Sequence, residues 1–120
     1  MGELIPKIVS AQAHRRFDIL VFPCLLGATV WMARRNGPAA SLVALTTATE
    51  AASFLTTDYP PAVLPWMGFR DHIRVGLIVP TAIAALAFLF RDIPPRERRF
   101  VLALLVLPIV LNVLSDGDQE

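Results

Sequence analysis

Glu50 lies within a long apolar stretch, together with hydroxyl residues at helical spacing. Steps of four, three and four residues join Thr46, Glu50, Ser53 and Thr57, so a helix places them on one face, which Thr49 flanks. An ionisable group inside such a stretch costs free energy and often marks a functional site. Glu50 could line a proton, cation or small-solute path. Alternatively, it could be protonated or paired with an arginine while the hydroxyl groups join neighbouring helices.

Two histidines precede apolar segments, His14 the first and His72 the third. Imidazole groups can ligate haem or a metal ion, but no ligand motif surrounds either histidine, so we predict no metal site and no cofactor. We expect an interfacial His72, hydrogen-bonded to Asp58 or Asp71. The same three residues could act as an acid–base set on lipid, although we favour a protein that is not an enzyme.

Charged residues also gather before the first and third apolar segments. In an antiparallel arrangement these positions lie on one side of a membrane, where we expect contacts with lipid headgroups and salt bridges. An anionic-lipid or partner-docking surface is the alternative. The predicted interfacial charge cluster comprises Arg15, Arg16, Asp18, Asp58, Arg70, Asp71, His72 and Arg74.

The elements that would position these groups are long apolar runs. The chain is 55% hydrophobic and only 18% charged, whereas charged residues make up about a quarter of an ordinary soluble domain. Most charges stand between the runs, a pattern typical of a membrane protein. Four spanning helices are predicted, at residues 17–33, 39–57, 73–90 and 100–114.

Short turns join the first pair and the last pair of these segments. The predicted fold is therefore all-α: an integral membrane antiparallel four-helix bundle that forms one domain over residues 1–120. Before it, Met1 to Arg16 combines apolar positions at helical spacing with Lys7 and His14 away from them. This segment predicts a short amphipathic helix at the membrane interface.

Several classes of function are disfavoured. A net charge of +1 gives no electrostatic reason to expect nucleic acid as a partner. The single cysteine, Cys24, excludes an intramolecular disulfide and a paired-cysteine redox or zinc motif, and we expect it to be a packing residue. No nucleophile elbow, phosphate-binding glycine loop or zinc-protease signature is present.

Residues 50 to 90 resemble small bacterial membrane proteins of the SPW-repeat type. The resemblance rests on Thr57-Asp58-Tyr59-Pro60, followed by His72 and a new apolar helix. The nearest equivalent of the family's Ser-Pro-Trp signature is Leu64-Pro65-Trp66. The resemblance implies a compact multi-helix membrane protein without an assigned chemistry.

These observations predict a small protein of a bacterial cytoplasmic membrane. We expect a non-catalytic accessory subunit or a self-associating scaffold, with the lipid bilayer as its surroundings and a homo-oligomer or a larger membrane complex as its assembly. The first alternative is an oligomeric proton, ion or small-solute channel or transporter that uses Glu50. The second is a membrane-embedded binder of haem, quinone or lipid that uses His14 or His72.

Overall fold

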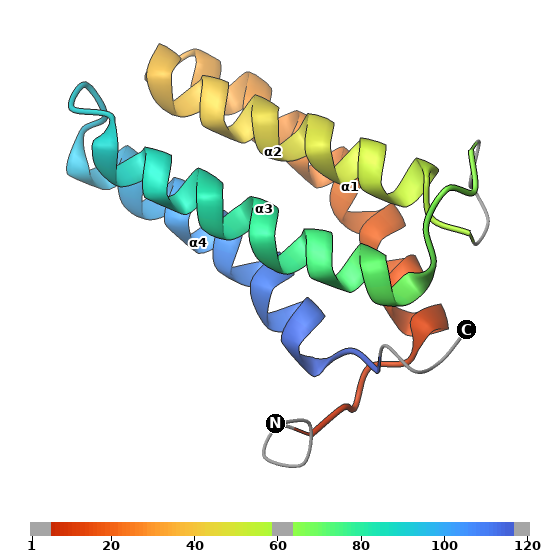
Figure 1. Cartoon of the computed structure of the whole chain (residues 1–120). Helices are drawn as coiled ribbons and strands as arrows, with labels where there is room; N and C mark the ends of the chain where they lie inside the picture. The colour runs from red at the N-terminus through yellow and green to blue at the C-terminus, as the bar shows by residue number, and fades with distance from the viewer. Residues whose placement is uncertain (1–5, 59–63, 117–120) are drawn as a thin grey trace.

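The computed structural model describes residues 6–58 and 64–116, and within them the chain is all-helical. Figure 1 shows four helices joined in sequence order. They are α1 (Ala11–Ala33), α2 (Gly37–Leu55), α3 (Phe69–Leu89) and α4 (Pro95–Leu114).

All four helices begin before the apolar segment that predicts them, α2 by only two residues and the others by four to six. The start of α1 at Ala11 is fixed by Ser10, whose hydroxyl accepts a hydrogen bond from the Ala13 N–H at 3.2 Å. Proline occupies the first position of α4, where its missing N–H costs nothing. The apolar runs therefore mark the middle of each helix, and the polar first turns extend beyond them.

The prediction of a separate interfacial helix at the N-terminus is wrong for the residues that the structure describes. Residues 6–10 are not helical, residues 11–16 belong to α1, and residues 1–5 lie outside the described range. Val9 instead pairs with the end of α4: its N–H donates to the Leu114 carbonyl at 3.0 Å, and its carbonyl accepts from the Asp116 N–H at 2.9 Å. This pairing uses backbone groups that a helix would need.

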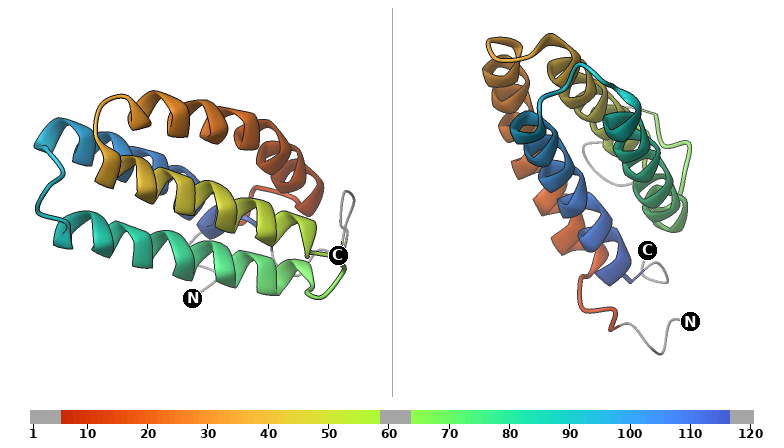
Figure 2. Two further views of the ribbon diagram at one scale, coloured as in Figure 1. Left: turned by 90° about the horizontal axis from the view of Figure 1, so that it is seen from above. Right: turned by 90° about the vertical axis from the view of Figure 1, so that its left-hand side faces the viewer.

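Figures 1 and 2 show α1 lying along α2, α3 along α4, and α2 along α3. The turns at residues 34–36 and 90–94 meet at one end of the molecule, which we call the turn end. There the Asn36 side-chain amide donates to the Asp92 carbonyl at 3.0 Å and joins the two turns. A buried apolar core fills this end: Met32, Ala39, Ala40, Leu42, Val43, Ile83, Ala87, Ile93, Val101 and Leu105.

The opposite end, which we call the loop end, holds the described parts of the connection from α2 to α3, together with residues 6–10 before α1 and residues 115–116 after α4. The Asp58 N–H donates to the Met67 carbonyl at 2.8 Å, and the Met67 N–H donates to the Thr56 carbonyl at 3.1 Å. These bonds hold the end of α2 beside the start of α3. The buried side chains here are largely polar, in contrast to the turn end.

Gly76 allows α3 and α4 to approach closely near the loop end. A Cβ atom at this position would overlap the side chain of Asn112 on α4. Asn112 is buried, and its amide nitrogen donates to the Pro108 carbonyl at 2.6 Å. A larger residue at position 76 would require the Asn112 side chain to move.

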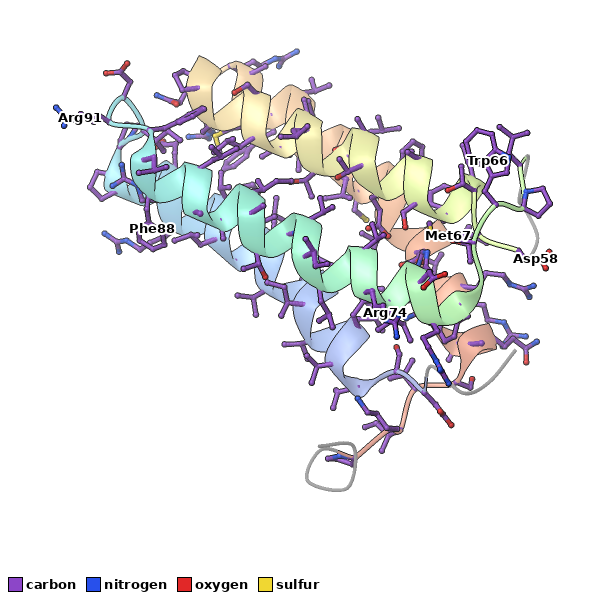
Figure 3. The ribbon with its side chains drawn as sticks, in the orientation of Figure 1. Asp58, Trp66, Met67, Arg74, Phe88 and Arg91 are labelled. Atoms are coloured by element: carbon purple, nitrogen blue, oxygen red, sulfur yellow. The ribbon has the colours of Figure 1, made fainter. Side chains whose placement is uncertain are left out.

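Two of the helices, α1 and α3, are long and apolar enough to cross a membrane. Their outer faces carry large apolar side chains, including Leu20, Val30 and Ile78, which are 58–70% exposed. Figure 3 shows Phe88 of α3 pointing outward from the helices, and its exposed fraction is 68%. Such weak burial is unusual for a core helix of a soluble domain.

Candidate functional site

Three ionisable side chains meet inside the loop end. His14 and Asp18 stand one turn apart on α1, and His72 reaches them from the first turn of α3. Their exposed fractions are 0%, 3% and 3%, respectively. Burying such groups is costly unless each finds a partner, so their mutual contacts define the site.

The contacts converge on three atoms. The His72 Nε2 atom lies 2.9 Å from the Asp18 Oδ2 atom and 3.1 Å from the His14 Nε2 atom. The His14 Nε2 atom lies 3.3 Å from the same Asp18 oxygen. These three atoms form a nearly equilateral triangle, and together they could hold a metal ion.

Hydrogen bonds on the far side of each ring fix where the histidine protons lie. The Ser115 hydroxyl is 2.6 Å from the Leu111 carbonyl and 2.7 Å from the His14 Nδ1 atom. A hydroxyl has one proton, and a carbonyl can only accept. The hydroxyl therefore donates to Leu111, and the His14 Nδ1–H donates to the hydroxyl.

The same geometry recurs at His72. The Thr57 hydroxyl is 2.6 Å from the Ser53 carbonyl and 2.7 Å from the His72 Nδ1 atom. The Ser53 hydroxyl lies 3.0 Å from the same nitrogen. His72 thus also donates from Nδ1, and in each neutral imidazole the Nε2 atom directs a lone pair toward Asp18.

An aromatic side chain screens the site from water. Phe69, 3% exposed, lies edge-on to the His14 ring at 5.1 Å and stacks with the His72 ring at 6.0 Å between centroids. Because a low-dielectric wall strengthens electrostatic interactions, the three converging acceptors interact strongly with any cation placed among them.

Glu50 extends the site toward the middle of the helices. Its side chain forms a hydrogen bond with Asp18. A hydrogen bond between two carboxyl groups contains one proton that they share. Asp18 therefore contacts both histidines on one side and Glu50 on the other.

Apart from Glu50, the residues of the polar face predicted on α2 divide into two groups. Ser53 and Thr57 contact His72, and Thr57 lies just beyond the last residue of α2. Thr46 is buried and Thr49 is half-buried, and both donate to carbonyls of their own helix, at 2.8 Å and 2.9 Å. Only the first group belongs to the histidine site.

The predicted interfacial charge cluster also divides. Asp18 and His72 belong to the buried site, and Arg15 is half-buried. The Arg74 guanidinium lies 3.3 Å from the Asp71 carboxylate in an exposed ion pair. The other exposed members are Arg16, Asp58 and Arg70.

The expectation of an interfacial His72 paired with Asp58 or Asp71 is corrected by these contacts. Asp58 and Asp71 are exposed, whereas His72 is buried, with Nε2 against Asp18 and Nδ1 against Ser53 and Thr57. Figure 3 places Asp58 at the outer edge of the loop end. The three residues of the suggested acid–base set therefore lie in different surroundings.

Sequence reasoning placed both histidines on one side but missed their convergence and the contribution of Ser115. One local signal was available: His14 and Asp18 have the four-residue spacing that puts two ligands on one helical face. The role of Ser115 depends on pairing between the two ends of the chain, which no local pattern encodes.

Comparison with known proteins found no matching family model, no similar curated protein and no similar solved structure. The resemblance to SPW-repeat proteins stays a prediction.

Proposed function

We propose that this chain is an integral membrane protein, an antiparallel bundle of four spanning helices that binds a divalent transition-metal ion. His14, His72 and Asp18 would be the ligands. The observation that carries the proposal is the convergence of two histidine Nε2 atoms and one carboxylate oxygen, while both Nδ1–H groups donate to hydroxyls on the far side.

The distribution of side chains supports a membrane location. The charged residues of the described chain lie at the two ends, except Asp18 and Glu50, which contact each other inside. Figure 3 shows Arg91 at the turn end and Asp58 with Trp66 at the loop end. Polar groups inside and apolar groups outside are the arrangement that hydrocarbon surroundings favour.

Helix length supports the same conclusion. At about 1.5 Å per residue, helices of 19 to 23 residues are roughly 28–35 Å long, close to the ~30 Å hydrocarbon core of a bilayer. The turns of three and five residues between paired helices favour antiparallel neighbours. Arg98 supports the second turn by donating to the Ala87 and Phe90 carbonyls at 2.9 and 3.0 Å.

The size of the triangle fits a metal ion. Its edges are 2.9, 3.1 and 3.3 Å. Ligands bonded to tetrahedral zinc at about 2.0–2.1 Å stand ~3.3 Å apart. A small divalent ion therefore fits the triangle after little movement of the ligands.

The surrounding hydrogen bonds also match those of metal sites. Histidine ligands of metals nearly always donate their other ring N–H to a fixed acceptor, and ligating carboxylates are themselves hydrogen-bonded. The Ser115 and Thr57 hydroxyls accept from the Nδ1–H groups of His14 and His72 in this way, and Glu50 is the hydrogen-bond partner of Asp18. Two histidines and one carboxylate are a ligand set used for zinc and for iron(II).

Three protein ligands leave coordination positions open, as in sites that bind a further ligand. The proposal is closest to the hypothesis of a membrane-embedded binder that uses His14 or His72. The accessory-subunit, scaffold and channel hypotheses stay predictions, as does assembly into an oligomer.

Zinc binding to chelator-stripped protein in lipid nanodiscs tests the proposal, by competition with a chromophoric chelator. We expect one zinc ion per chain for the wild type and at least a hundredfold weaker binding for His72→Ala. Asp71→Asn is the matched control, because it changes an exposed neighbour and should bind zinc normally. Wild-type binding as weak as that of His72→Ala would show that a proton, not a metal ion, bridges the site.

A further inference from the structure

A second feature adjoins the histidine site. A cavity of about 180 Å³ lies between α1, α2 and α4, and both Asp18 and Glu50 line it. The rest of its wall is almost entirely apolar, with Leu25, Leu104 and Leu111 as examples. A dry apolar cavity of about 150 Å³ is known to accept benzene, so this one has room for a small organic group.

The mouth of the cavity opens on the outer face of the helices. Phe17 and Leu107 at its rim are 37% and 51% exposed, and Cys24 beside them is exposed rather than packed as predicted from the sequence. Helices α1 and α4 have few contacts with each other, which leaves this gap open. In the proposed membrane location the mouth faces lipid, so an occupant would arrive from the bilayer.

The donors of the two neutral polar side chains on the wall are already used within their own helices. The Thr46 hydroxyl donates to the Leu42 carbonyl at 2.8 Å, and the Cys24 thiol donates to the Leu20 carbonyl at 3.6 Å. Asp18 and Glu50 are the two acidic residues of the lining, and their carboxyl oxygens can accept hydrogen bonds. An occupant whose head carries a hydrogen-bond donor is therefore complementary to this part of the wall.

We propose that this cavity binds a lipid-soluble molecule with a neutral hydroxyl head, such as an alcohol or a phenol. Its O–H donates to the carboxyl oxygens of Asp18 and Glu50, and its apolar part lies against Leu104 and Leu107. The preference for a neutral head rests on the proposed function: a metal ion on the far side of Asp18 repels a cationic head. The hydroxyl then lies beside a metal ligand, which identifies the occupant as a candidate substrate or effector of that centre.

Photolabelling in nanodiscs tests this inference, with a diazirine derivative of 1-octanol as the probe and mass spectrometry of the labelled residues. We expect labelling on cavity residues of α1 and α4, competed by 1-octanol at least tenfold more effectively than by octane. Leu107→Trp should abolish this labelling by filling the mouth. Val106→Trp, which adds the same ring at an exposed neighbour outside the cavity, should leave it unchanged.

Any other outcome of the labelling experiment contradicts the inference. Equal competition by octane would mean that the carboxyl groups play no part, and better competition by octylamine would mean a cationic head. Labelling that persists in Leu107→Trp would place the alcohol elsewhere. Zinc content is measured in the same samples, so wild-type protein that is labelled but lacks zinc contradicts the metal proposal alone. Protein with zinc but no cavity label contradicts only the alcohol site.

Discussion

The two ends of the molecule are held together by different physics. At the turn end, ten buried apolar side chains from all four helices and from the turn between α3 and α4 pack against one another. At the loop end, a buried polar network links α1 and α3 to the residues that follow α2 and α4. Its members are His14, Asp18, His72, Thr57 and Ser115. Dispersion between close-packed atoms stabilises the first, whereas directional bonds stabilise the second.

The difference has a consequence for function. An apolar core tolerates exchanges between apolar side chains of similar volume and has no preference for an ion, whereas a polar network is stable only when each member is satisfied. If a metal ion completes the loop end, the stability of that end depends on the ion and the stability of the turn end does not.

Removal of the metal ion should give the largest effect. At a zinc concentration a hundredfold above Kd, binding stabilises the site by about 2.7 kcal/mol. Adding a chelator should therefore raise amide exchange by up to about a hundredfold around residues 11–18, 69–75 and 112–116, and should leave residues 37–43 and 83–87 unchanged. Hydrogen exchange with mass spectrometry measures this, and an equal rise at both ends would contradict the separation.

Leu105→Ala should destabilise the turn end by about 2 kcal/mol. Leu105 is 1% exposed, so its truncation leaves a cavity. In the proposed membrane location the cost is at the low end of the known range, because lipid supplies little hydrophobic driving force. Thermal unfolding in detergent measures the loss. Leu107→Ala, at a position 51% exposed, is the control and should change stability by less than half as much; zinc affinity should stay at the wild-type value in both.

Thr57→Val should weaken zinc binding about tenfold or more without disrupting either end. The substitution keeps the shape but removes the hydroxyl that accepts from the His72 Nδ1–H, and loss of such an outer partner typically costs 10–100-fold in affinity. Thr56→Val is a close control, because the Thr56 hydroxyl also bonds to its own helix at 2.6 Å. Equal affinities in the two variants would exclude the assigned role of Thr57.

Arg74→Ala should have the smallest effect. The Arg74–Asp71 ion pair joins side chains that are 65% and 59% exposed, and such pairs contribute less than about 1 kcal/mol. We expect unchanged zinc affinity and a change in thermal stability close to the error of the measurement. A tenfold loss of zinc affinity would mean that the exposed charges and the buried site act together.

The presence of four helices could be predicted because each contains a long apolar run. The starts could not be predicted, because α1, α3 and α4 each begin with a more polar first turn that lies before the apolar run. Residues 1–16 show the limit of periodicity: a helical pattern was present, but pairing of Val9 with Leu114 and Asp116 prevailed over its first part.

The site was predictable only in fragments. Asp18, His72, Glu50, Ser53 and Thr57 were all selected from the sequence, but as members of two unrelated groups. These residues form one site only because α1 and α3 bring them together. Ser115 contacts His14 from a position 101 residues further along the chain. Local spacing carries no information about such contacts.

X-ray absorption at the zinc K-edge, on wild-type protein reconstituted with one equivalent of zinc, tests the metal centre most directly. The proposed site predicts nitrogen and oxygen ligands at about 2.0–2.1 Å and the outer-shell scattering of two imidazole rings. His14→Ala and His72→Ala should each reduce this imidazole scattering, because each removes one ring. A spectrum of zinc surrounded by oxygen without imidazole scattering would contradict the account and leave the three residues as a proton-bridged structural network.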